Sequence, residues 1–155
     1  MKISEYSNES EYRRCVLVVD DNDRVRHMLS LALATAGFDV AAASTQQQAH
    51  HRLASIRPDA LILNLQRSEA DGLDVLRCMR ARQDLLNVPI VFLSGSDSDD
   101  FRWHTLRAGA DWFGLRPVGL ADLQKRLRQL IRHGRPTLKL IASNRPPTRQ
   151  LKPTG

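Results

Sequence analysis

Residues 60–65 read ALILNL, an apolar run that only Asn64 interrupts. A short, nearly unbroken apolar run predicts a strand that is buried on both faces, as in a parallel sheet with helices on each side. The run follows Pro58, which ends the preceding helical pattern. Four similar apolar runs occur elsewhere in the chain, and each of them predicts a further strand of the same sheet.

The apolar runs alternate with segments whose apolar residues fall at helical spacing. Such alternation predicts an α/β fold with a doubly wound, five-stranded parallel sheet. The expected strands cover residues 15–21, 38–44, 60–65, 90–94 and 112–115. The expected helices cover residues 22–36, 44–57, 73–82, 98–107 and 119–132. Glycines at 37 and 109 stand where a left-handed residue would stop a helix.

Polar residues follow the ends of four predicted strands. They are two acids, an amide, a hydroxyl and a cation: Asp20, Asp21, Asn64, Ser94 and Arg116. Ligands of doubly wound sheets bind beyond the carboxyl ends of the strands, so we expect these side chains to meet in one site. They are the parts of a phosphoryl-accepting pocket in which an amide stands where a carboxylate should attack. An amide cannot attack phosphorus as a carboxylate does.

The charge of the chain is divided between a body and a tail. The net charge is +6, but residues 1–133 hold all 17 acids and 18 of the 23 basic residues, a net charge of +1. Residues 134–155 hold five basic residues, no acid and four of the seven prolines. We therefore expect a polar extension over 1–14, one domain over 15–133 and a flexible basic tail over 134–155. The tail leaves open nonspecific nucleic-acid contact or a role as a linker.

Several classes of protein are disfavoured by the sequence. No apolar run approaches the roughly 20 residues of a membrane span, and the N-terminus has no apolar signal region, so a cytoplasmic location is expected. Cys15 and Cys78 lack metal-ligand spacing and are expected to be buried thiols. No nucleophile-base-acid set and no phosphate-cradling glycine loop is visible, so the chain is not expected to be an enzyme.

The order of the motifs resembles the receiver domain of bacterial two-component response regulators. The resemblance covers about residues 15–133 and rests on VVDDND at 18–23, LILNLQRSEADG at 61–72, FLSG at 92–95 and GADWFGLRP at 109–117. It implies a flavodoxin-like fold and a place in phosphorelay signalling. It also implies a protein partner, either a histidine kinase or another signalling protein.

The resemblance assigns roles to single residues. Asp20 and Asp21 fall on the acidic pair that holds Mg²⁺, with Gln66 grouped beside them, and Asn64 falls on the phosphoacceptor. Ser94, Phe113 and Arg116 fall on the switch hydroxyl, the switch aromatic and the usual lysine; Pro117 follows, often after a cis bond in the family. The chain departs from the family pattern at Asn64, at Arg116, at Arg67-Ser68 in place of a Met-Pro pair, and at Val118.

The altered pocket has three readings. Asp20 and Asp21 could simply cap the following helix and favour its dipole. They could form a weak metal or anion site, because loss of one carboxylate lowers the affinity for Mg²⁺. Arg116 could lie across one of them as a bidentate pair and neutralise the pocket without metal. Tight metal binding is not expected, and no other cofactor is implied.

The predicted function is that of an atypical single-domain receiver, a pseudo-receiver, that binds a protein without phosphorylation. Trp103, Trp112 and Phe113 fall on the fourth helix and fifth strand, which with the last helix form the family's usual partner face, and a homodimer is compatible with it. Neighbouring strand residues point to opposite faces, so Trp112 or Phe113 could be core. Phosphorylation at a non-standard residue, Ser68 or Ser94, is the alternative; Ser94 could equally bond only to backbone.

Overall fold

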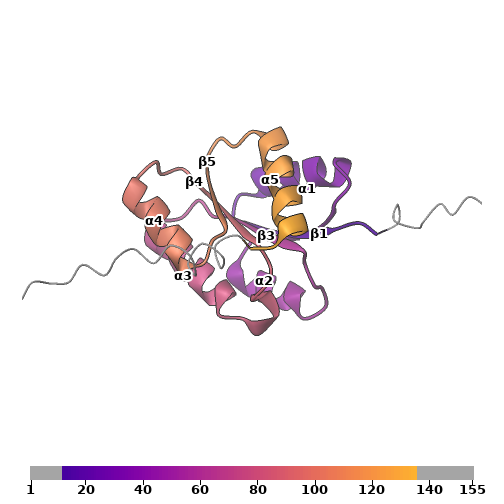
Figure 1. The fold of residues 1–155 in the computed structure, drawn as a ribbon, viewed down its shortest axis with the longest axis horizontal. Coiled ribbons are helices and arrows are strands. Elements are labelled where there is room, and N and C mark those ends of the chain that lie inside the picture. The colour runs from indigo at the N-terminus through magenta and orange to yellow at the C-terminus, as the bar shows by residue number, and fades with distance from the viewer. Residues whose placement is uncertain (1–11, 136–155) are drawn as a thin grey trace, which may run out of the picture.

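The computed structural model describes residues 12–135, and these fold into one five-stranded parallel sheet with helices on both faces (Figure 1). The strand order is β2-β1-β3-β4-β5. The strands are β1 (Cys15–Asp20), β2 (Asp39–Ala43), β3 (Ala60–Asn64), β4 (Ile90–Ser94) and β5 (Trp112–Leu115). The helices are α1 (Asp23–Thr35), α2 (Gln46–Leu53), α3 (Glu69–Arg80), the short 3-10 helix η2 (Gln83–Leu85), α4 (Asp99–Ala108) and α5 (Leu120–His133). The predicted doubly wound α/β fold is confirmed.

Each face of the sheet has its own apolar core. On one face, α1 and α5 pack through Leu29, Leu33 and Leu127 against alternate strand residues such as Val18 and Ile62. On the other face, α2, α3 and α4 cover the intervening strand residues. Because both faces are covered, the strands are apolar at nearly every position, and this is why the sequence runs alone identify them.

Local capping explains where most helices begin and end. Asn22 accepts a hydrogen bond from the Val25 amide at 3.0 Å and starts α1. Thr45 caps α2 one residue after the predicted start, since its hydroxyl accepts from Gln48 N at 3.1 Å. Gly37 and Gly109 have φ values of 100° and 119°, which confirms both predicted stops.

The third helix begins four residues earlier than its apolar spacing predicts. Ser68 accepts from Asp71 N at 3.2 Å, and acids fill the first turn, so α3 starts at Glu69. Gly72 therefore lies inside the helix. A Cβ at Gly72 would stand 3.0 Å from the Phe92 ring, so the glycine lets α3 approach β4 closely.

Both ends of the described range qualify the expected domain limits. Gly134 and Arg135 continue from α5, and Arg135 is buried. Residues 1–11 and 136–155, which include most of the expected extension and tail, lie outside the described residues. Among the helices within 12–135, none is long and apolar enough to cross a membrane.

The two cysteines differ from the prediction. Cys15 is partly buried in β1, but Cys78 is exposed on α3, so the expectation of a buried thiol is wrong there. Cys78 occupies the outer surface of α3, where its Sγ accepts from Gln46 Nε2 of α2 at 2.7 Å. Cys78 directly precedes the buried Met79, and the apolar spacing did not show that the buried face of α3 ends between these two residues.

Candidate functional site

Asp20 and Asn64 form the centre of the site. They end the adjacent strands β1 and β3, where they are register partners, and both are almost fully buried. Asn64 Nδ2 donates to Asp20 Oδ2 at 2.9 Å. The other carboxylate oxygen of Asp20 accepts from Asn22 N at 2.9 Å. A buried carboxylate is thus held by two N–H donors, one of which is the side-chain amide of Asn64.

Arg116 lies on the other side of Asn64. Its Nη1 donates to Asn64 Oδ1 at 2.9 Å and, at 3.4 Å, to the carbonyl of Leu65. Of the three readings of the pocket, the one that pairs Arg116 directly with Asp20 or Asp21 is wrong. The reason is that a carboxamide can donate and accept at once. Asn64 occupies the space between the acid and the guanidinium and links them by two hydrogen bonds.

The surroundings raise the pKa of Asp20 above its ordinary value. Burial is the main cause, and the nearby Asp21 carboxylate adds to it. The hydrogen bonds from Asn22 and Asn64 and the charge of Arg26 act in the opposite direction. Burial therefore destabilises the charged form of Asp20, and the hydrogen bonds from Asn22 and Asn64 stabilise it.

Asp21 points away from this chain of contacts. Its Oδ1 accepts from the backbone amide of Gln66 at 2.9 Å, and its Oδ2 lies 3.5 Å from Arg67 Nε. The Arg67 side chain is half-exposed, so this ion pair contributes little. Asp21 and Gln66 thus meet through a hydrogen bond from the Gln66 backbone amide, which fastens the loop after β3 to the end of β1.

The residues present fit a magnesium ion poorly. Mg²⁺ requires near-octahedral oxygen ligands, and here the candidates are Asp20, Asp21 and the amide oxygen of Asn64. That amide oxygen already accepts from the Arg116 guanidinium, a cation that would repel the metal. Within residues 12–135, no three His, Cys, Asp or Glu side chains gather in a possible metal cluster. The site could hold a metal only if Arg116 moved away.

Ser94 ends β4 beside the same site. It is nearly buried, and its Oγ accepts from Ser96 N at 3.0 Å, in agreement with the backbone-bonding reading. Ser94 lines a cavity of about 320 Å³ together with Arg67, Ser68 and Arg116. Ser68 Oγ also accepts a backbone hydrogen bond as the cap of α3. Both candidate hydroxyls thus have a local structural role. The Arg116–Pro117 bond that closes this edge is cis.

The three aromatic residues are divided between core and surface. Phe113 is the core member: its ring stacks on Phe92 at 6.1 Å and meets Phe101 edge-on at 5.8 Å. Trp112 lies half-buried on the opposite face, 5.4 Å below the Arg126 guanidinium. Trp103 on α4 is 66% exposed. On the expected partner face, Trp103 is therefore exposed and Trp112 is partly exposed.

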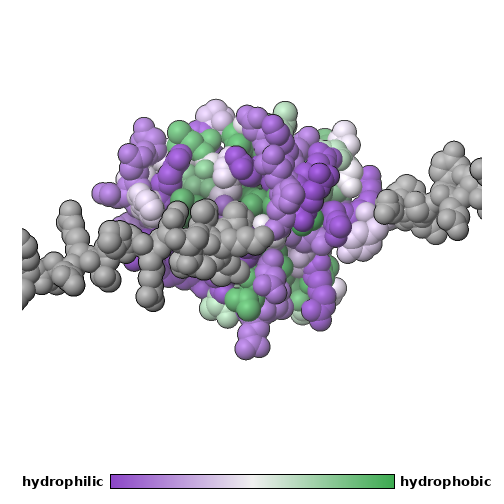
Figure 2. Space-filling model, viewed as in Figure 1, coloured by the Kyte–Doolittle hydropathy of each residue, from purple (hydrophilic) through white to green (hydrophobic). Residues whose placement is uncertain are grey.

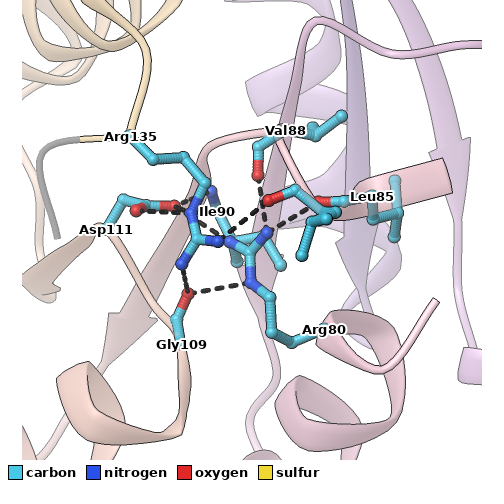
Figure 3. A network of polar contacts seen from close by, with 8 residues as sticks. Arg80, Leu85, Val88, Ile90, Gly109, Asp111 and Arg135 are labelled. Carbon is cyan, nitrogen blue, oxygen red and sulfur yellow. Dashed lines mark hydrogen bonds and ion pairs between the residues drawn. The ribbon is translucent and has the colours of Figure 1, made fainter. Parts of the chain in front are cut away.

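Sequence reasoning missed a second polar centre at the opposite end of the sheet (Figure 3). Asp111 precedes β5 and is buried between Arg80 of α3 and Arg135 after α5. Arg80 Nη2 and Arg135 Nε each lie 2.9 Å from its carboxylate. The Ile90 amide donates to the same carboxylate at 2.9 Å, at the start of β4.

The two arginines also bind backbone carbonyls. Arg80 donates to the carbonyls of Gly109, Leu85 and Val88, and Arg135 donates to those of Gly109 and Leu86. Burial and the proximity of Arg135 lower the pKa of Arg80 to about 10. The network ties α3, η2, β5 and the end of α5 together. Its one sequence signal was an acid directly before an apolar strand.

A comparison against known families agrees with the fold. The sequence profile of the response regulator receiver domain matches residues 16–128. The chain therefore belongs to the response regulator receiver domain family, whose members are generally non-enzymatic signalling modules of two-component systems.

Curated relatives and solved structures support this membership. The response regulator MprA of Mycobacterium avium (strain 104) is 39% identical over 121 residues, which cover 78% of this chain and 52% of the relative. MprA of Mycobacterium tuberculosis (strain ATCC 25618 / H37Rv) has the same identity and coverage. The chain thus spans about half the length of the curated relatives that it matches.

Among solved structures, a putative response regulator from Chloroflexus aurantiacus has 26% identity and a TM-score of 0.70, covering 78% of this chain and 99% of that one. The receiver domain of the sensor histidine kinase PA1611 from Pseudomonas aeruginosa has 26% identity and a TM-score of 0.67, covering 77% and 98%. That structure has a magnesium ion coordinated in its active site cleft.

Proposed function

We propose that this chain is a receiver that works without phosphorylation at position 64 and acts as a protein-binding module. The observation that carries the proposal is the hydrogen-bonded chain Asp20–Asn64–Arg116. It satisfies the buried acid and the guanidinium with an amide, at the position that the family resemblance gives to the phosphoacceptor.

The chemistry of the amide supports this proposal in two ways. Its nitrogen is not a nucleophile, and its N–H donates to Asp20, so position 64 offers no carboxylate oxygen for attack on phosphorus. Its oxygen accepts from Arg116, so a metal would have to compete with a cation for that atom. The pocket has a stable arrangement without metal or phosphoryl group.

The proposed partner is a histidine kinase or another signalling protein, and the proposed contact surface is the α4–β5–α5 face. Three large apolar side chains are exposed on these elements: Trp103 on α4, Leu115 on β5 and Leu120 on α5. Tryptophan is the side chain most enriched at energetically dominant interface positions. A second copy of the chain is a further occupant that this face would admit.

The proposal is tested by capturing partners from the native cell with the full chain and with two variants. Trp103→Ala should lose the partner, because it removes the most exposed aromatic anchor. Arg52→Ala, an exposed change on α2 near the opposite edge of the sheet, should retain it. Acetyl phosphate should not change the amount captured. Capture that requires acetyl phosphate, or that survives Trp103→Ala unchanged, would overturn the proposal.

A further inference from the structure

The outer surface of α5 carries a row of basic residues. Lys125, Arg128 and Arg132 are exposed at a spacing of three and four residues, which places them on one face of the helix. Figure 2 shows hydrophilic residues gathered over this helix. Within residues 12–135, no ion pair joins any of these three side chains to an acid.

Two cavities meet along this row. One, of about 310 Å³, is lined by Lys125, Arg128, Arg132 and His133. The other, of about 400 Å³, is lined by Arg14, Arg128 and Arg132 together with the apolar side chains of Tyr12, Phe38 and Ile131. Arg128 and Arg132 border both cavities, and only the larger one extends from α5 to residues that precede β1, Tyr12 and Arg14.

Two of the guanidiniums lie over aromatic rings. Arg14 lies 5.1 Å from the centre of the Tyr12 ring, and Arg128 lies 5.1 Å from the centre of the Phe38 ring. Arg128 also donates to the carbonyl of Ala36 at 2.6 Å. Arg14 is partly balanced by Asp59 at 3.7 Å, whereas Arg132 is not in a described ion pair. Arg14, Arg128 and Arg132 thus place three positive charges around one cavity, and a multiply charged anion bound there would be stabilised by them.

We propose that the larger cavity is a binding site for a nucleoside polyphosphate. Its phosphates would lie on Arg128, Arg132 and Arg14, and its ring would lie in the larger cavity, against the 69% exposed Tyr12. The size of that cavity is within the range of small-ligand sites. The apolar wall favours a phosphate ester with a ring over an inorganic phosphate chain. The site lies on the α1–α5 side and shares no residue with the cavity beside Asn64, but it shares α5 with the proposed partner face.

The test is calorimetric titration of the full chain with ATP and GTP, with adenosine and tripolyphosphate as probes that each lack one half of the ligand. We expect saturable one-to-one binding of a nucleoside triphosphate. Tripolyphosphate should bind at least about tenfold more weakly, and adenosine should not bind. Arg132→Ala and Arg14→Ala should each weaken binding about tenfold, the loss of one charge-assisted hydrogen bond.

Arg52→Ala is the matched control, since it removes an exposed guanidinium from α2 and makes the same change in net charge. It should bind as the unmodified chain does. Arg132→Ala decides alone if Arg14→Ala does not fold. The proposal is overturned if neither nucleotide binds saturably, if Arg52→Ala weakens binding as much as Arg132→Ala, or if tripolyphosphate binds as tightly as the nucleotides. Tighter binding of a single-stranded oligonucleotide would also overturn it, in favour of a polyanion surface.

Discussion

Asn64→Asp is the change that most directly perturbs the hydrogen-bonded chain. It replaces the N–H that donates to Asp20 Oδ2 at 2.9 Å by a carboxylate oxygen. Two buried charges about 4 Å apart repel each other by about 4 kcal/mol at an effective dielectric constant near 20. The Arg116 guanidinium returns part of this, about 1.5–3 kcal/mol, because its hydrogen bond now reaches a charged acceptor. We expect a net loss of unfolding free energy of about 2 kcal/mol at neutral pH without divalent ions.

The assay is urea unfolding in EDTA and in millimolar MgCl₂, followed by tryptophan fluorescence. Mg²⁺ should restore stability to Asn64→Asp, because the variant supplies a third anionic oxygen, and should leave the unmodified chain almost unchanged. Asn64→Ala is the control: it removes the amide without adding charge, so its loss should not depend on Mg²⁺. The reasoning is refuted if Asn64→Asp is as stable as the unmodified chain in EDTA, or if both respond equally to Mg²⁺.

Three further predictions concern the polar residues of the described structure. Asp111→Ala leaves Arg80 and Arg135 buried without their carboxylate and should cost about 3–5 kcal/mol in urea unfolding, whereas truncation after Arg135 should cost almost nothing; the reverse order would contradict the role given to the network. Arg116→Ala removes hydrogen bonds to Asn64 and Leu65 and should lower the unfolding free energy by only about 1 kcal/mol. A loss as large as that for breaking a buried ion pair would instead support direct pairing of Arg116 with an acid. Because the folded state raises the pKa of Asp20 above the ordinary 3.8, it binds that proton more tightly than the unfolded chain; the unfolding free energy should fall as pH rises from the ordinary toward the raised pKa, and comparison with Asp20→Asn over this window should show the slope disappear.

The fold was predictable because burial on both faces leaves a strong signal in each strand. A run such as residues 90–93 is apolar and buried at every position, and a glycine such as Gly109 marks a left-handed stop. The start of α3 was not predictable from apolar spacing. Gly72 resembles a loop residue in the sequence, and only the approach of Phe92 explains a glycine inside the helix.

The site was predictable in its members but not in its contacts. Strand ends bring Asp20, Asn64 and Arg116 together in any parallel sheet of this order. Which of them bond depends on the two-sided hydrogen bonding of the Asn64 amide, and charge alone suggested a direct Arg–Asp pair. Arg135 was placed in the tail by composition, although tertiary contact with Asp111 makes it part of the body.

Intact-mass measurement after incubation with acetyl phosphate and Mg²⁺ tests the central claim most directly. The full chain should gain no phosphoryl group, because Asn64 has no nucleophilic oxygen and its amide is engaged by Asp20 and Arg116. Asn64→Asp should gain one under the same conditions. A phosphoryl adduct on the unmodified chain, whether on Ser68, Ser94 or another pocket residue, would contradict the account, as would an Asn64→Asp variant that remains unmodified.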